Sequence, residues 1–134
     1  MSSISGSCLC GKVYFESEND FNDFHLCHCV QCQKVTGSAH AANIFTQPNN
    51  IKWLSGESLV KRFDVPGRAI STAFCGECGA PVPYLSRNQK DLIIPVGCLN
   101  GVPNISPQDN IFCSEKAAWY DQGIIAKSFD KFPD

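Results

Sequence analysis

The hydrophobic pattern consists of short apolar runs separated by turn-forming residues. Six runs rich in β-branched and aromatic side chains are predicted to be strands, at 12–17, 21–26, 39–45, 68–74, 80–85 and 91–99. Segment 51–65 predicts two further short strands around a Ser-Gly turn. Residues 34–38 favour a short turn or helical turn, 101–110 a loop, and 111–134 only weak helical structure. We therefore expect a mainly β fold with little helix.

Length and composition indicate one folded unit of modest size. The chain has 134 residues, of which 43% are hydrophobic and 18% charged, so we expect a single domain over 1–134. A net charge of −2 disfavours binding to nucleic acid or anionic lipid. No apolar run approaches the ~20 residues that cross a bilayer. The first residues also lack a secretory pattern, so a soluble cytoplasmic protein is expected.

The cysteines carry most of the chemical information. There are nine, and seven of them fall into three groups with the spacing of metal ligands. The groups are a C-x-C-G at Cys8 and Cys10, a C-x-C-x-x-C at Cys27, Cys29 and Cys32, and a C-x-x-C-G at Cys75 and Cys78. Thiolates two or three positions apart on a turn can hold one tetrahedral ion, and a following glycine lets the chain turn.

The seven thiols divide naturally into four and three. The pair at Cys75 and Cys78 needs two more ligands, which the pair at Cys8 and Cys10 can offer. Four thiolates would form a closed structural zinc site. The remaining trio would leave a fourth position for water or substrate, as in a catalytic zinc site. Because sulfur donors favour a soft incoming ligand, a substrate thiol suits that position better than hydroxide.

Other interpretations of the cysteines remain open. Cys75 and Cys78 could be a redox dithiol, and the trio could be a thiol pair or an oxidation sensor. Single cysteines within apolar runs, Cys98 and Cys113, are expected to be small buried side chains.

The remaining polar and aromatic candidates receive modest roles. His28 lies between two predicted ligands, so in an extended segment it would point away from them, beside the site or towards solvent. His25 and His40 are expected to be structural or surface groups, and Trp53 and Trp119 to be packing anchors.

No basic cluster is visible along the chain. The cations considered for binding an acidic substrate are each expected to be solvated: Lys34, Arg62, Arg68 and Arg87. Thr36 and Ser38, just after the trio, are candidate hydroxyl donors, although a role in the turn is favoured.

Taken together, four segments resemble the glutathione-dependent formaldehyde-activating enzyme family, which also contains centromere protein V. The segments are SCLCGKVYFE, CHCVQCQKVTGSAHAANIF, FCGECGAPV and AAWYD, and the resemblance runs from about residue 5 to 125. It implies a β-tent fold of small twisted antiparallel sheets around zinc. It also implies two Zn²⁺ per chain, a structural ion at Cys8, Cys10, Cys75 and Cys78 and a catalytic ion at Cys27, Cys29 and Cys32.

The resemblance further implies an activity. The family is named for joining glutathione and formaldehyde into S-hydroxymethylglutathione, and the reverse direction is that of a carbon–sulfur lyase. The expected partners are therefore a small thiol such as glutathione and a small aldehyde. The alternative is a non-catalytic or redox-sensitive zinc module with a different partner.

Overall fold

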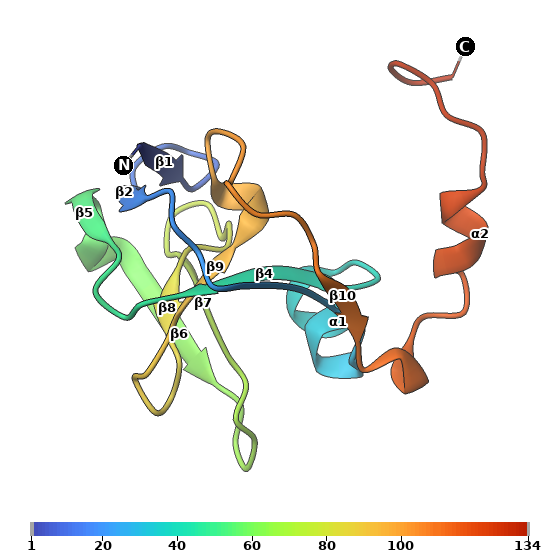
Figure 1. The fold of residues 1–134 in the computed structure, drawn as a ribbon, viewed down its shortest axis with the longest axis horizontal. Coiled ribbons are helices and arrows are strands. Elements are labelled where there is room, and N and C mark those ends of the chain that lie inside the picture. The colour runs from blue at the N-terminus through green and yellow to red at the C-terminus, as the bar shows by residue number, and fades with distance from the viewer. Residues whose placement is uncertain (1, 134) are drawn as a thin grey trace.

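The computed structural model describes residues 2–133 and is mainly β, as the sequence predicts. Its strands form three small sheets (Figure 1). The first sheet is antiparallel and contains β1 (Ser3–Ser7), β2 (Tyr14–Glu18) and β5 (Lys52–Ser55), in the order β1-β2-β5.

The second sheet contains five strands and carries part of the candidate site. In spatial order they are β10 (Asp109–Ile111), β3 (Asp23–Cys27), β4 (Ala41–Thr46), β9 (Leu92–Pro95) and β8 (Tyr84–Leu85). Neighbours are antiparallel except β10 and β3, which run parallel. The long connection before β10 therefore returns the chain beside the strand that leads into the cysteine trio.

The third sheet is a hairpin of β6 (Val60–Asp64) and β7 (Ser71–Cys75). The helices are short: α1 (Val30–Thr36) adjoins the end of β3, and α2 (Tyr120–Ile124) lies to one side of the sheets in Figure 1. Single 3-10 turns occur at Glu57–Leu59, Val96–Cys98 and Cys113–Glu115. Within residues 2–133, neither helix has the length or the apolar character needed to cross a membrane.

Helix α1 is longer than the predicted turn at 34–38, and it begins within the cysteine trio. The Sγ of Cys29 accepts a hydrogen bond from the backbone N–H of Cys32, so a predicted metal ligand caps the helix. Gly37 ends it with φ of 69°, and its N–H donates to the carbonyl of Gln33. The cap explains why a segment of weak helical propensity becomes helical.

Two strands escape prediction because tertiary pairing creates them. The small polar residues of β1 give little strand signal, yet the whole segment pairs with β2 and buries Ile4. Strand β10 spans the end of the predicted loop 101–110 and the first residue of the tail predicted to be weakly helical, and it forms by pairing with β3. The other predicted strands are present, with ends displaced by a few residues.

The buried core is divided into three clusters, and cysteines belong to two of them. One joins Cys8 and Cys75 to Val13, Ala73 and Val82. A purely apolar cluster contains Phe24, Ile44, Leu92 and Ile94. The third consists of the cysteine trio and Ala41. Much of the interior is therefore built around the predicted ligands.

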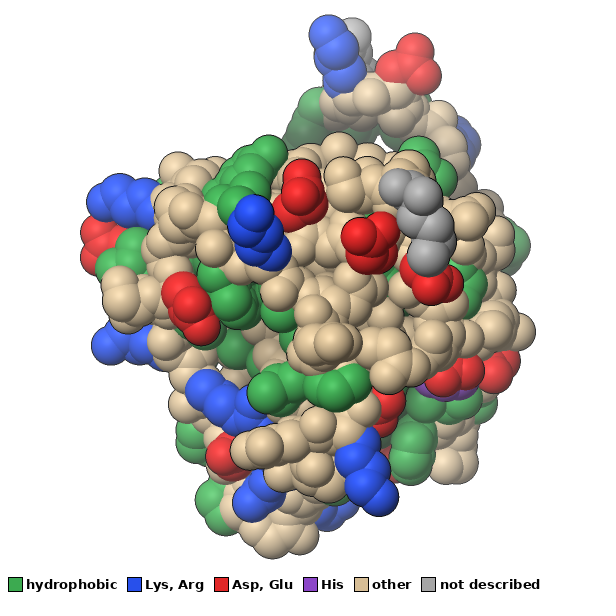
Figure 2. Space-filling model, turned by 60° about the vertical axis from the view of Figure 1, so that its left-hand side comes forward, with side chains coloured by type: hydrophobic (Ala, Val, Ile, Leu, Met, Phe, Trp, Pro, Cys, Tyr) green, Lys and Arg blue, Asp and Glu red, His purple; other side chains and the backbone are tan. Residues whose placement is uncertain are grey.

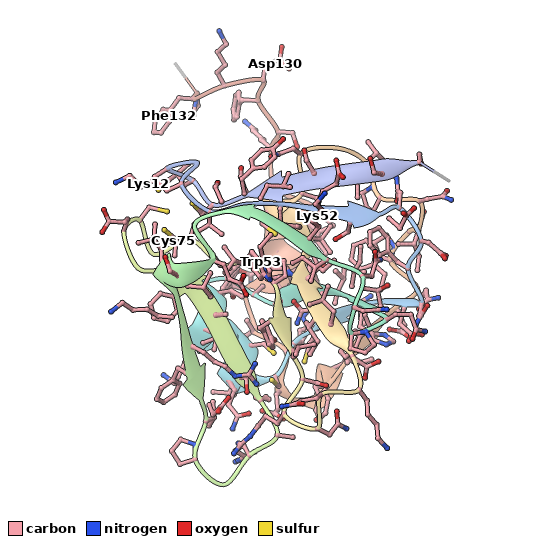
Figure 3. All side chains as sticks on the ribbon, turned by 90° about the vertical axis from the view of Figure 1, so that its left-hand side faces the viewer. Lys12, Lys52, Trp53, Cys75, Asp130 and Phe132 are labelled. Carbon is pink, nitrogen blue, oxygen red and sulfur yellow. The ribbon has the colours of Figure 1, made fainter. Side chains whose placement is uncertain are left out.

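The two tryptophans differ in environment. Trp53 packs against the first cluster and meets the Phe15 ring edge-on at 5.9 Å, as expected of a packing anchor (Figure 3). Trp119 is 57% exposed, so the same prediction is wrong for it. It lies in a C-terminal segment that leaves the sheets, and Phe132 stands well away from them in Figure 3. Acidic and basic side chains are interspersed on the face in Figure 2.

Candidate functional site

The structure brings together the four cysteines predicted to form a closed site. Their sulfurs all lie within 4.8 Å of one another. The Sγ of Cys10 is 3.5 Å from that of Cys8 and 3.9 Å from that of Cys75. Sulfurs around a tetrahedral zinc, each about 2.3 Å from the ion, would be about 3.8 Å apart. The donor set therefore fits one zinc ion.

Two turns position these sulfurs. The first follows β1 and the second follows β7, and Lys12 Nζ joins them through Glu77 Oε1 at 3.0 Å. Backbone N–H groups of Val13 and Glu77 donate to the sulfurs of Cys8 and Cys75 at 3.3 Å. Figure 3 shows Cys75 near Lys12 at one end of the molecule.

The surroundings of Cys78 favour its thiolate form. Hydrogen bonds from the backbone N–H groups of Ala80 and then Cys10 lower the pKa of Cys78 to about 6. A thiolate is the form that binds a metal ion. This part of the cluster is thus prepared for a cation at neutral pH.

The structure also gathers the trio of Cys27, Cys29 and Cys32. Their sulfurs lie within 4.8 Å of one another, at the end of β3 and the start of α1. Burial is the main cause that raises the pKa values of Cys27 and Cys32. These thiols therefore stay protonated until a cation displaces their protons.

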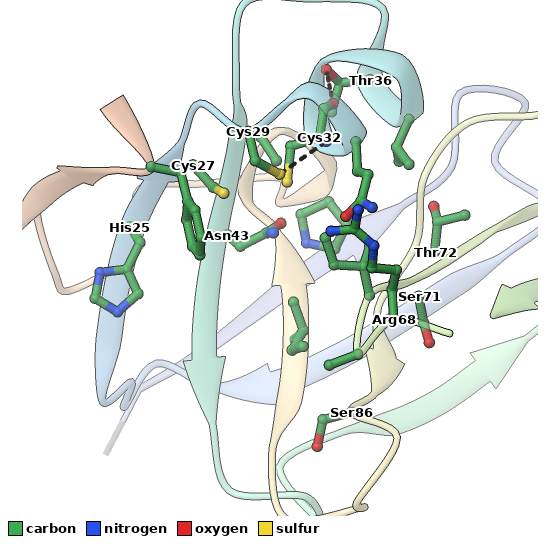
Figure 4. Close-up of a pocket in the computed structure, with 18 of the residues that line it drawn as sticks. His25, Cys27, Cys29, Cys32, Thr36, Asn43, Arg68, Ser71, Thr72 and Ser86 are labelled. Carbon is green, nitrogen blue, oxygen red and sulfur yellow. Dashed lines mark hydrogen bonds between the residues drawn. The ribbon is translucent and has the colours of Figure 1, made fainter. Parts of the chain in front are cut away.

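A cavity of about 690 Å³ adjoins the trio (Figure 4). All three cysteines line it, whereas none of the four cysteines of the other cluster does. Its size falls within the range of ~300–1,000 Å³ typical of small-molecule sites. A ligand in this cavity can therefore reach the trio.

His28 is fully buried next to the trio, so it is not solvent-facing. Its Nε2 is 2.8 Å from Asn110 Oδ1 on β10. Its ring also meets the rings of His40 and Tyr120 edge-on, at 5.1 and 4.8 Å between centroids. Burial, and then the neighbouring His28, lowers the pKa of His40. His28 thus packs behind the predicted ligands.

The sequence did not predict that several residues would lie on the cavity wall. Arg68 and Arg87, predicted to be scattered and solvated, both line the cavity, and so does Asn43. His25, predicted to be a structural or surface group, also lines it, with Nδ1 2.6 Å from Asp109 Oδ1. These residues come from four separate segments, so no local spacing reveals them.

Other predictions have simpler outcomes. Cys113 is exposed, not buried, because it begins the segment that leaves β10. Cys98 is partly buried. The hydroxyl of Thr36 donates to the carbonyl of Cys32 at 2.8 Å, which is the predicted turn role at the end of α1, and Lys34 is exposed.

Comparison with known proteins adds a family and a fold. The family model described as glutathione-dependent formaldehyde-activating enzyme matches residues 3–115. The search of curated proteins gave no match. The crystal structure of a Rhodobacter sphaeroides protein from structural genomics aligns with a TM-score of 0.62 and 22% identity, covering 79% of this chain and 98% of that one. At this identity the likeness concerns the fold alone.

The family match extends over most of the described chain. It includes all three cysteine groups and the strand β10 that lies beside the trio. The chain belongs to the glutathione-dependent formaldehyde-activating enzyme family.

Proposed function

We propose that this protein is a zinc-dependent enzyme that adds a thiol, most concretely glutathione, to formaldehyde or another small aldehyde and cleaves the adduct in reverse. One observation carries the proposal: three cysteine sulfurs lie within 4.8 Å of one another on the wall of a cavity of about 690 Å³. The four-cysteine cluster is proposed to hold a second, structural zinc.

The donor chemistry supports zinc at both clusters. Thiolate ligands are typical of zinc, and three of them leave one position for a substrate. A zinc ion at the trio would act as a Lewis acid that raises the thiolate fraction of the substrate thiol at neutral pH.

The addition balances without an oxidant or reductant. A bond forms between the thiol sulfur and the carbonyl carbon, the carbonyl double bond becomes single, and the thiol proton ends on the oxygen. The side chain of Asn43 extends into the cavity near the trio (Figure 4). Its amide N–H can donate to the oxygen as negative charge develops there. The trio, with its ion, is thus proposed to bind the sulfur of the new hemithioacetal, and Asn43 to donate to its oxygen.

Replacement of Cys29 by serine tests the proposal. Serine is a good N-cap, so Cys29→Ser retains a cap on α1 while removing a thiolate ligand. We expect about one zinc per chain in place of about two, a folded protein, and turnover reduced by at least about 100-fold, since the open metal site is lost. Turnover can be measured as exchange between glutathione and its formaldehyde adduct by NMR, above the uncatalysed rate.

The matched control is Cys113→Ser, at an exposed cysteine outside both clusters. It should leave metal content and exchange unchanged. If zinc-loaded wild-type protein neither binds glutathione nor accelerates exchange, the enzymatic assignment fails and a non-catalytic zinc module remains.

A further inference from the structure

The side chains that line the cavity include more cations than anions. Its lining includes two arginines, Arg68 and Arg87, and one carboxylate, Glu115. Glu115 is already engaged, because its Oε1 accepts a hydrogen bond from the backbone N–H of Val30 at 3.1 Å. His25 is paired with Asp109. The cavity wall therefore carries more positive than negative charge.

Arg68, like Arg87, has no carboxylate counterion among residues 2–133. Over residues 2–133, no carboxylate oxygen lies within 4.0 Å of its guanidinium, whereas Arg62 pairs with Asp64 at 2.9 Å. The neighbour of Arg68 is neutral: with the Gln31 amide oxygen turned towards it, that oxygen accepts from Nε and Nη1 at 3.1 and 3.2 Å. A guanidinium has five N–H donors, so several remain free for a ligand.

Arg68 lies next to the helix that begins within the trio. Gln31 lies on α1 between Cys29 and Cys32, so the contact between Gln31 and Arg68 spans from the trio's helix to the β6–β7 connection. Figure 4 shows Arg68 just below α1, on the side of the cavity where Ser71 and Thr72 lie. A ligand that reaches the trio with one end can thus meet Arg68 with another part.

Hydrogen bonds from a second loop hold the loop that carries Arg68. Arg87, between β8 and β9, donates through Nη1 to the carbonyls of Val65, at 3.0 Å, and Arg68. The Val65 N–H donates to the Ile70 carbonyl at 3.0 Å, which closes the loop. These bonds fix the backbone of Arg68, so less freedom is lost when its side chain binds a ligand.

We infer that Arg68 binds a carboxylate of the thiol substrate and selects acidic thiols over neutral ones, with Arg87 holding the loop in place. Arginine and carboxylate match in geometry and form paired, charge-assisted hydrogen bonds. The inference rests on the proposed function and deepens it, because it names the substrate class as a thiol that carries a carboxylate at a distance from its sulfur.

The test compares glutathione with its diethyl ester, which keeps the thiol and removes both negative charges. For wild-type, zinc-loaded protein we expect kcat/KM for glutathione to exceed that for the ester by about 10- to 100-fold, the effect of one charged hydrogen-bonded contact. Arg68→Leu should reduce this ratio to near one, mainly through a higher KM for glutathione. Arg68→Lys keeps the charge and should retain part of the preference.

The matched control is Lys90→Leu. Lys90 is exposed on the β8–β9 connection and does not line the cavity, so this variant removes a positive charge nearby and should keep the wild-type ratio. Thermal unfolding of each variant checks that the fold is retained. The inference is overturned if the wild-type protein treats both thiols equally, or if Arg68→Leu lowers kcat/KM for both by the same factor.

Calorimetric binding of both thiols separates this inference from the proposed function. If no turnover is detected but glutathione binds more tightly than its ester in an Arg68-dependent way, the carboxylate site stands and the enzymatic assignment fails. If both thiols are turned over at equal efficiency, the enzymatic assignment stands and the role of Arg68 is wrong. Equal or absent binding without turnover contradicts both.

Discussion

Gly56 packs against the turn that carries the first cysteine pair. It has φ of 75°, and a Cβ at this position would be 2.1 Å from the carbonyl oxygen of Lys12. Lys12 follows Cys8 and Cys10 by a few residues, and the Ser55 hydroxyl donates to the same carbonyl at 3.1 Å. Glycine is thus required both by backbone conformation and by space.

Replacing Gly56 with alanine should therefore destabilise the fold. We expect Gly56→Ala to lower the free energy of unfolding by about 3 kcal/mol, because strain at positive φ adds to a clash with backbone that cannot move cheaply. Denaturant unfolding measures the change.

Gly123→Ala is the control. Gly123 is in helix α2 and open space surrounds its Cβ position, so alanine should be neutral or stabilise by up to about 1 kcal/mol. Equal stability of Gly56→Ala and wild type would show that the approach to Lys12 is not restrictive.

For single residues, the sequence predicts a role where the partners lie close by along the chain. Cys27, Cys29 and Cys32 could be grouped because ligand spacing within a turn is itself a signal. The turn at Gly56 was also predicted, but its approach to Lys12 was not. Arg68 could not be placed at the cavity, because a lone arginine carries no spacing and only the folded loops bring it there.

Helix α2 is attached to the sheets through Tyr120. The Tyr120 ring meets His28 and His40 edge-on, at 4.8 and 5.5 Å between centroids. By contrast, Ile124, Ile125, Phe129 and Phe132 of the same C-terminal segment are exposed. The contact therefore joins α2 to the side of the trio away from the cavity, since neither His28 nor Tyr120 lines that cavity.

We expect Tyr120→Ala to lower the free energy of unfolding by about 2 kcal/mol, because two aromatic contacts and the burial of the ring are lost. Hydrogen exchange should also become faster in residues 117–126.

The neighbouring Trp119 provides the control. It is larger but 57% exposed, so Trp119→Ala should change stability by less than about 0.5 kcal/mol. If the two variants destabilise equally, the attachment depends on some other part of the segment.

Elements were predictable where the hydrophobic pattern alone specified them. The strands around the apolar cluster of Phe24, Ile44, Leu92 and Ile94 have strong β-branched or aromatic runs, and all were found. Strands β1 and β10 have weak runs and exist through pairing with β2 and β3. A prediction from local propensity does not include the free energy gained when these strands pair.

In the molecule as a whole, we expect metal binding to be coupled to folding, because the predicted ligands form part of the buried core. The buried residues form three separate clusters, and cysteines make up much of two of them. The four-cysteine cluster joins the turn after β1 to the turn after β7, segments 65 residues apart at Cys10 and Cys75. Such a link restrains distant parts of a chain with a modest apolar core.

Stepwise removal of metal should therefore have two distinct effects. The trio offers three donors on the wall of a cavity, whereas the other cluster offers four donors, enough to complete a tetrahedral site. We expect a competing chelator to take the ion of the trio first, abolishing exchange while the circular dichroism spectrum is preserved.

Removal of the second ion should unfold the protein. A structural zinc site contributes about 10–16 kcal/mol of binding free energy, which is comparable with the whole stability of a small domain at about 5–15 kcal/mol. The Cys29→Ser variant provides an internal reference, because it should show only the second step. A native spectrum after both ions are gone would mean that the apolar clusters suffice without metal. Unfolding at the first step would mean that the trio, not the four-cysteine cluster, holds the sheets together.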